Sequence, residues 1–177
     1  MTRRSNWTSL ENYAGHEVSD QGEIRNAKSR DILKTSVNQT GVRYVSIRNT
    51  VTMSYENKAL SVLMAETFLG MPNKEAETVL HLDGDISNAS ANNLRWSTRY
   101  HAMAFHREID NPMYRIRRRI QDENGRIYSC VQEASHFTGD LPSAIDYTIR
   151  YNDNMAQDTH ANFIHKTHPG GHIFKSA

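Results

Sequence analysis

Residues 80–96 read LHLDGDISNASANNLRW. Apolar residues stand at the two ends, with Leu80 before and Leu94 and Trp96 after a segment dense in Asp, Asn and Gly. These three residue types favour turns, because Asp and Asn hydrogen-bond nearby backbone and Gly readily adopts a positive φ. The stretch therefore predicts a strand that ends at His81, a long turn and a return strand.

A helix is expected to follow the return strand. Ser97 or Thr98 supplies a hydroxyl N-cap, and Asn111-Pro112 ends the helix because a residue before proline avoids the helical conformation. A histidine at the end of the first strand of such a unit can face one metal ion. A general base and a divalent cation are the minimum for hydrolysing a phosphodiester. An asparagine that closes the loop is expected to hydrogen-bond the loop backbone and hold that histidine in position.

The flanking sequence predicts small elements on both sides. Before the central segment, short β-like patches from residue 7 to 47 predict an antiparallel sheet, and residues 60–69 predict a helix that stops at Gly70. After it, the turn signal at residues 122–125 predicts a strand pair. Two helices with a short turn follow, at residues 131–137 and 143–150, with Ile145 and Ile149 on the inner face of the second. Residues 172–174 are a possible last strand.

Composition favours small modules over one large core. Only 37% of the 177 residues are hydrophobic and the mean hydropathy is −0.71, so little material is available for burial. No apolar stretch approaches the roughly 18 residues that span a bilayer, and the N-terminus lacks an apolar signal core, so we expect an intracellular, cytoplasmic protein. Cys130 is the only cysteine. It is interpreted as a small buried hydrophobe, with a reactive thiol as the alternative.

Charge gives two opposing signals. The net charge is only +1, which is low for a protein that holds a polyanion. A local basic stripe, however, indicates a DNA contact better than a total does, and the alternative is a solvated basic face. The arginines of this stripe are Arg95, Arg99, Arg107, Arg115, Arg117, Arg118 and Arg119. Four tail histidines, at positions 160, 165, 168 and 172, match no metal-ligand spacing and are expected to be solvated.

The motif formed by His81, Asp83-Gly84, Asn88 and residues 92–96 resembles that of the HNH homing endonucleases, specifically the phage intron-encoded nicking type. The resemblance covers nearly the whole chain. Residues 13–26, YAGHEVSDQGEIRN, look like the family's N-terminal DNA-binding module, and residues 33–34 and 41–47 match its second half. Residues 120–149 look like the family's C-terminal helix-turn-helix module.

The resemblance implies an α+β fold in an extended modular chain. Its expected parts are a β-rich DNA-binding module at residues 1–50, a ββα-metal (His-Me finger) HNH domain at 51–110, an arginine-rich connector at 111–119, and a helix-turn-helix module with tail at 120–177. His81 corresponds to the general base and Asn93 to the loop-closing asparagine. The implied function is site-specific binding of double-stranded DNA by a monomer, with Mg²⁺- or Mn²⁺-dependent nicking of one strand.

Several positions depart from the family pattern. Leu80 stands where the nicking enzymes have a metal-ligating Asp, and Ser61 where members usually have a His. The third family position, Asn or His on the helix, falls on Ala102, whose methyl group cannot coordinate a hard cation. His101, or a carboxylate of Asp83 or Asp85, is the candidate replacement. Catalysis is therefore expected to be weakened or lost, with retained nicking as the alternative. The alternative function is a catalytically inactive regulator that binds DNA or a nucleoprotein partner.

The expected DNA contacts follow the modules. The second helix of the helix-turn-helix would lie in the major groove, where Asp146 would repel phosphate unless it reads a cytosine amino group. This half is alternatively a protein-binding surface, and RNA or ribosome binding is a third possibility for the chain. Trp96 is interpreted as a core anchor. The candidate DNA-binding residues are Lys34, Arg43, Arg95, Arg99, Arg115, Arg117, Arg118, Arg119, Ser143, Tyr147 and Arg150.

Overall fold

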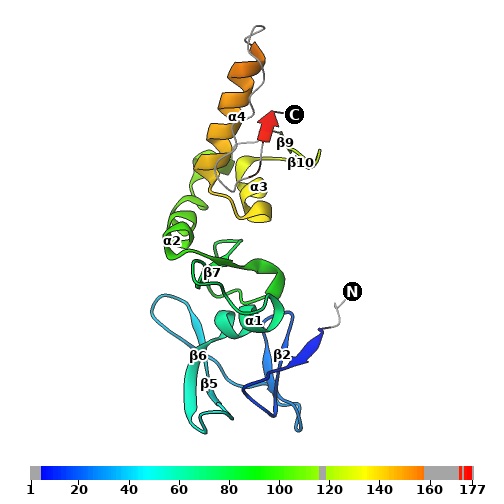
Figure 1. The fold of residues 1–177 in the computed structure, drawn as a ribbon, viewed down its shortest axis with the longest axis vertical. Coiled ribbons are helices and arrows are strands. Elements are labelled where there is room, and N and C mark those ends of the chain that lie inside the picture. The colour runs from blue at the N-terminus through cyan, green and yellow to red at the C-terminus, as the bar shows by residue number, and fades with distance from the viewer. Residues whose placement is uncertain (1–4, 116–118, 158–171, 173, 177) are drawn as a thin grey trace. The chain divides into compact units, whose positions relative to one another are not determined.

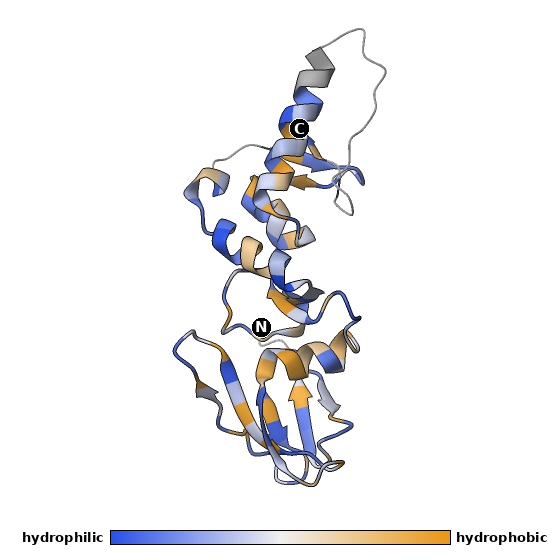
Figure 2. Ribbon diagram, turned by 60° about the vertical axis from the view of Figure 1, so that its left-hand side comes forward, coloured by the Kyte–Doolittle hydropathy of each residue, from blue (hydrophilic) through white to orange (hydrophobic). Residues whose placement is uncertain are grey.

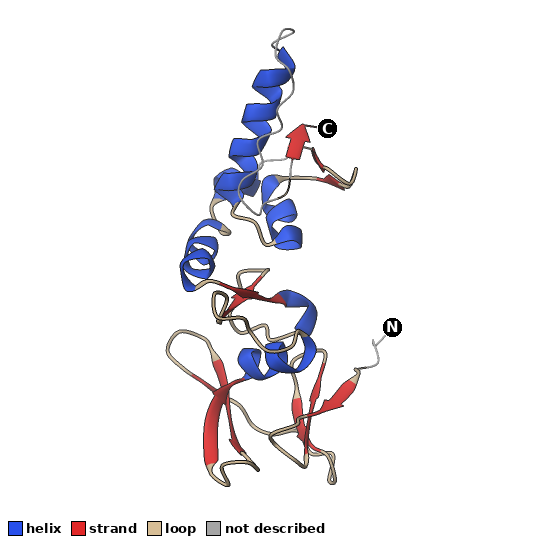
Figure 3. Cartoon of the chain, viewed as in Figure 1, coloured by secondary structure: helices blue, strands red, loops and turns tan. Residues whose placement is uncertain are grey.

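A computed structural model describes residues 5–115, 119–157, 172 and 174–176. The chain forms two compact units, one made of Met1–His81 with Asp85–Arg99 and the other of Leu82–Gly84 with Tyr100–Ala177. Both contain helices and small sheets, as expected for an α+β chain (Figure 3). No helix in the described part of the chain is long and apolar enough to cross a membrane.

The first unit contains two antiparallel sheets of three strands and one hairpin (Figure 1). The sheet orders are β1-β2-β3 and β4-β5-β6, and β7 pairs with β8. Helix α1 contacts β5, β6, β7 and β8. The bounds are β1 Trp7–Ser9, β2 His16–Ser19, β3 Ile24–Asn26, β4 Ser36–Val37, β5 Arg43–Arg48, β6 Tyr55–Ala59, α1 Leu60–Phe68, β7 Thr78–His81, η1 Ala91–Asn93 and β8 Leu94–Ser97.

One core joins these elements. Buried apolar side chains from both sheets, from α1, from the loop after β7 and from β8 form a single cluster, and α1 is strongly apolar (Figure 2). Residues 44–48 of β5 pair with residues 55–59 of β6, so the boundary expected after residue 50 falls inside a hairpin. The expected N-terminal module and the β7–β8 hairpin therefore share their packing. The cluster includes Val18, Ile24, Val45, Ile47, Leu60, Leu63, Met64, Ala89 and Leu94.

The second unit contains a three-stranded sheet, β10-β9-β11, and three helices within the described residues. Its buried cluster includes Ile120, Tyr128, Ala134, Ile149 and Phe174. The predicted positions of α3 and the start of α4 are confirmed, whereas α4 runs past residue 150. The bounds are α2 Arg99–Glu108, η2 Pro112–Arg115, β9 Ile120–Asp122, β10 Ile127–Tyr128, α3 Val131–Thr138, α4 Pro142–Gln157 and β11 Phe174–Ser176.

Local chemistry sets the ends of α3. The Cys130 sulfur accepts a hydrogen bond from the Glu133 backbone N–H at 3.4 Å, so the half-buried cysteine is an N-cap and not the buried hydrophobe expected of it. Gly139 ends the helix with φ 76°, a left-handed conformation that glycine adopts without steric cost.

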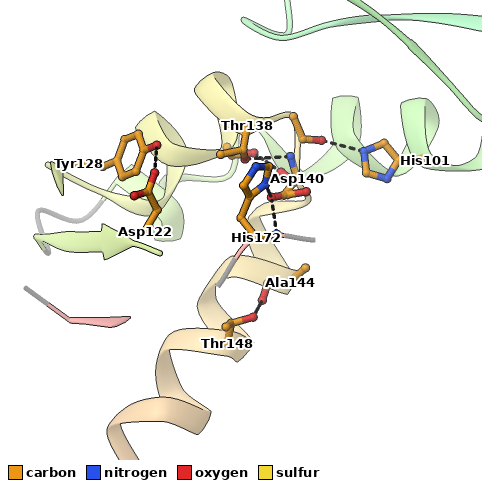
Figure 4. Close-up of polar contacts among 10 residues, drawn as sticks. His101, Asp122, Tyr128, Thr138, Asp140, Ala144, Thr148 and His172 are labelled. Atoms are coloured by element: carbon orange, nitrogen blue, oxygen red, sulfur yellow. Dashed lines mark hydrogen bonds and ion pairs between the residues drawn. The ribbon is translucent and has the colours of Figure 1, made fainter. Parts of the chain in front are cut away.

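One tail histidine is only partly solvated, with 38% of the His172 side chain exposed and a carboxylate beside its ring. The Nδ1 atom of His172 lies 2.8 Å from the Asp140 carboxylate (Figure 4), just before strand β11, which pairs with β9. The sequence did not predict this partner, because spacing along the chain does not reveal a carboxylate that lies 32 residues away. His160, His165 and His168 lie outside the described residues.

Candidate active site and nucleic-acid-binding surfaces

His81 ends β7, where it pairs with Leu94, the first residue of β8. Only 5% of His81 is exposed. Because Asn93 immediately precedes Leu94, the histidine and the asparagine meet at the same end of the hairpin. Leu80 occupies the position at which the resemblance led us to look for a metal-ligating Asp, and its side chain is fully buried.

Asn93 closes the loop between the two strands. Its side-chain Nδ2 donates to the backbone carbonyl of Asn88 at 3.0 Å, and Asn93 is 8% exposed. The Asn88 Oδ1 atom in turn accepts from the hydroxyl of Ser90 at 2.8 Å and from its backbone N–H at 3.2 Å. The expected bond from the asparagine amide to the loop backbone is therefore present.

Asp85 lies in the same loop and is exposed. Its Oδ1 atom accepts from the Ser87 hydroxyl at 2.7 Å and from the Ser87 backbone N–H at 2.9 Å. These two bonds, with a smaller contribution from His81, lower the pKa of Asp85 below its ordinary value. The carboxylate thus both forms the turn and places a negative charge near His81.

Asp83 belongs to the second unit and is exposed. It interacts with His106 of α2 and His136 of α3, two histidines that the sequence did not single out. Burial lowers the pKa of both imidazoles, and Asp83 and Asp110 partly oppose that shift. No periodic signal marks these histidines, since each occupies an ordinary helical position.

His101 has a defined partner within the second unit. Its Nε2 atom lies 2.8 Å from the carbonyl oxygen of Gly139, at the end of α3 (Figure 4). The neighbouring Ala102 is buried, with 3% exposure. One ring nitrogen of His101 is therefore hydrogen-bonded to the backbone. Ala102 has no side-chain atom that could coordinate a metal ion.

The candidate metal ligands do not form a recognisable metal centre. Among the residues that the structure describes, no group of three or more His, Cys, Asp or Glu side chains is arranged to hold a metal ion. Hard divalent cations need several oxygen or nitrogen ligands from protein or water. The protein donors present thus do not by themselves fit the ion that the HNH resemblance implies, and no catalytic step is assigned to it.

The predicted DNA-binding residues differ in their surroundings. Lys34, Arg95, Arg99 and Arg119 are exposed, whereas the half-buried Arg43 donates to the Gly22 carbonyl at 3.3 Å. Arg115 is exposed and pairs with Asp110 at 3.1 Å. Arg117 and Arg118 lie outside the described residues.

Ser143, Tyr147 and Arg150 are exposed on α4. Their i, i+4, i+7 spacing places them on one helix face. Asp146 pairs with Arg150, with 2.7 Å between Oδ2 and Nε, so its charge is balanced by a neighbour on the same helix.

An exposed sheet face was missed by the sequence analysis. On β5, Val45 and Ile47 are buried, while Ser46 and Arg48 point to the other face and are exposed. Their partners on β6, Asn57 and Tyr55, are exposed as well. The alternation in residues 43–48 contained this signal, because every second side chain of a strand shares a face. These two cross-strand pairs combine a cation, an aromatic ring and hydrogen-bonding groups, and they contain no carboxylate.

Two known proteins are similar to this chain, and no protein-family model matches it. An uncharacterized HNH endonuclease of Acanthamoeba polyphaga mimivirus is 32% identical over 148 residues, which are 80% of this chain and 43% of the viral protein. This chain thus spans less than half the length of that relative. The sequence similarity supports a relationship to the HNH endonucleases.

The chain is also similar to a solved structure of the HNH homing endonuclease I-HmuI. That structure was solved to study DNA binding and cleavage by I-HmuI. The match covers 97% of this chain and 98% of that one, with 17% identity and a TM-score of 0.46.

Proposed function

We propose that this chain is an HNH-type DNA endonuclease that binds double-stranded DNA as a monomer and nicks one strand. The observation that carries the proposal is the hairpin end at which buried His81 stands beside Asn93, with the Asn93 amide on the Asn88 carbonyl. The sequence similarity to a viral HNH endonuclease supports the same chemistry. In this proposal the chain is of the phage intron-encoded nicking type and acts inside the cell.

His81 is the proposed general base. Its imidazole takes a proton from the attacking water, and the nearby Asp85 carboxylate stabilises the positive charge that results. Asn93 fixes the loop and so the orientation of the ring. A divalent cation, Mg²⁺ or Mn²⁺, would supply charge stabilisation of the phosphate if one binds; Asp83, Asp85 and His101 are the ligands proposed from the sequence, although the described residues do not form a ligand group of three.

Exposed surfaces of both units are the proposed DNA contacts. The face with Ser46, Arg48, Tyr55 and Asn57 has the hydrogen-bonding and basic groups with which sheets read a groove. In the second unit, α3 and α4 would act as a helix-turn-helix, with Ser143, Tyr147 and Arg150 toward the DNA. The exposed arginines contribute phosphate contacts, which position the protein without reading sequence.

A catalytically inactive DNA- or nucleoprotein-binding regulator is the second candidate. Two observations favour it: the methyl group of Ala102 at the family's ligand position, and the lack of a three-residue ligand group among the described residues. On this alternative the same surfaces bind, and His81 remains a buried part of the hairpin.

A plasmid-nicking assay separates the two candidates. Supercoiled DNA is incubated with the wild type and with His81→Ala, with Mg²⁺, with Mn²⁺ and with chelator. Endonuclease activity predicts open-circular product that needs metal and disappears in His81→Ala. If the wild type and His81→Ala bind a labelled duplex without nicking it, the result would support the regulator. If neither protein binds DNA, both candidate functions would be contradicted.

A further inference from the structure

The turn between β2 and β3 is closed by internal hydrogen bonds and lies against residues 85–93, which precede β8 and are named the HNH loop below. Ser19 is fully buried; its backbone N–H donates to the Glu23 carbonyl at 2.9 Å, and its hydroxyl oxygen accepts from the Glu23 N–H at 3.1 Å. Within the turn, the Gly22 N–H donates to the Ser19 carbonyl at 3.1 Å. These bonds fix residues 19–23 independently of the loop they meet.

The loop contacts this turn through its backbone. The Ala91 N–H donates to the Asp20 carbonyl at 3.0 Å. A Cβ added at Gly22 would lie 2.9 Å from the carbonyl carbon and 3.0 Å from the oxygen of Ala89. Such distances require the backbone to shift. Glycine is therefore the residue type at position 22 that lets the turn approach the loop this closely. The backbone φ of +80° at Gly22 also favours glycine.

The second sheet supports the same loop. Arg43 of β5 donates from Nη1 to the Gly22 carbonyl at 3.3 Å, which ties the β4-β5-β6 sheet to the turn. A Cβ on Gly41, before β5, would lie 3.4 Å from side-chain carbons of Ile86 in the loop. Turns from both N-terminal sheets thus lie close to the loop, and the turn at residues 20–22 is the one that hydrogen-bonds it.

We propose that the turn at residues 20–22, with Arg43, positions the HNH loop for the reaction. Ala89 follows Asn88, whose carbonyl accepts the Asn93 amide, so holding Ala89 and Ala91 in place also holds the bond that closes the loop beside His81. Gly22 and Arg43 are positioning residues, and the N-terminal sheets are part of the nuclease site as well as a DNA-binding surface. The catalytic consequence rests on the proposed function, but the structural coupling does not.

The chain contains a matched control for Gly22→Ala. Gly15 has nearly the same φ, +85°, yet a Cβ there would have nothing within 4 Å. Both substitutions impose a side chain on left-handed backbone, and only Gly22→Ala also drives a methyl group into Ala89. Hydrogen exchange followed by NMR in the full chain reports the outcome at the Ala91 and Asn93 backbone amides, which bond Asp20 and Ser90 carbonyls.

Gly22→Ala is expected to speed exchange at Ala91 and Asn93 by about tenfold or more relative to Gly15→Ala, and to shift the Asn93 side-chain amide signals. The amides of the β5–β6 ladder serve to correct for global stability. Arg43→Met tests the same coupling without backbone strain and should give a smaller change in the same direction, which Arg43→Lys partly reverses. Equal exchange in the Gly22 and Gly15 variants, or unchanged loop amides in Arg43→Met, would overturn the proposal.

Nicking kinetics give the second readout. A positioning role predicts that Gly22→Ala lowers kcat and leaves KM for a plasmid substrate unchanged, whereas Gly15→Ala preserves both. If the wild type does not nick DNA, the proposed function fails and the exchange data still decide the coupling. If the wild type nicks and Gly22→Ala does so at the same kcat, the positioning role fails alone.

Discussion

The Nε2 atom of His101 and the carbonyl oxygen of Gly139 lie 2.8 Å apart. This bond joins the first turn of α2 to the left-handed residue that ends α3. It satisfies a carbonyl at the helix terminus, where no intrahelical donor is available. His101 thus has a structural partner in addition to its predicted candidacy as a metal ligand.

His101→Ala should lower the free energy of unfolding of the second unit by about 1 kcal/mol, the usual net value of one such hydrogen bond. The measurement is urea unfolding of the full chain. Met103→Ala is the control on the same helix, because Met103 is 65% exposed and should change little. Equal stability of the two variants would show that the bond contributes nothing.

Asn93→Ala should cost about 1 kcal/mol of stability, because it leaves the half-buried loop carbonyl of Asn88 without its side-chain donor. Urea unfolding and hydrogen exchange of the loop amides measure the effect. The adjacent Asn92 is exposed, so Asn92→Ala should leave both quantities near the wild-type values. A loop that stays equally protected in Asn93→Ala would argue against this closing role.

The Tyr128 hydroxyl donates to the buried Asp122 carboxylate at 2.9 Å (Figure 4). Burial, then the bond to Asp122, raises the pKa of Tyr128 to about 12. Burial alone would raise the pKa of Asp122, but hydrogen bonds from Arg126, Tyr128 and Asn124 hold it below its ordinary value. The pair therefore stabilises the fold between two limits of pH.

Tyr128→Phe should remove a contribution to the free energy of unfolding that is lost both at low pH and at high pH. The Asp122 contribution is present above its unfolded pKa of about 3.9 and is lost as pH falls through the lower folded value. The Tyr128 contribution is present below about 10 and is lost as pH rises through about 12. The difference in unfolding free energy between wild type and variant, measured across pH, should be largest from about 5 to 9. Tyr100→Phe, at an 82% exposed site, should show no such profile.

Arg48→Ala should weaken DNA binding and reduce the salt slope by about 1 if the guanidinium contacts a phosphate. Arg48 is exposed on the sheet face that also carries Tyr55. Fluorescence anisotropy with a labelled duplex at several salt concentrations measures the slope. Lys74→Ala removes an equal charge from an exposed site off that face and should leave the slope unchanged. Identical slopes for the two variants would exclude the face as a contact.

Local signals in the sequence were enough for most of the secondary structure. The Gly70 and Gly139 stops, the turn at residues 122–125 and the i, i+4 pair Ile145 and Ile149 all depend on neighbours within one helical turn or hairpin. The hydrogen bond from Asn93 to the loop was predictable for the same reason, since donor and acceptor are five residues apart.

Partners that are distant in the sequence could not be predicted. The bonds of His101 to Gly139 and of His172 to Asp140 span 38 and 32 residues. The support of the HNH loop by Gly22 likewise depends on a tertiary contact with Ala89. The sequence predicted an N-terminal module separate from the β7–β8 hairpin, so it did not predict this contact. The two parts share one core, and a shared core leaves no boundary in the amino-acid composition along the chain.

Ala102→Asn tests whether a missing ligand limits catalysis. Ala102 is 3% exposed, so a larger side chain should cost about 1 to 3 kcal/mol of stability through overpacking. Ala102→Leu has the same number and branching of side-chain heavy atoms without a donor atom and is the matched control. If position 102 is the family's ligand position, the Asn variant should nick plasmid DNA about tenfold faster than the Leu variant in Mn²⁺, the scale on which groups around a metal affect activity. His81→Ala in the same background should abolish the gain, because a restored ion still needs a base. Equal rates for the Asn and Leu variants would show that a donor atom at position 102 does not limit nicking.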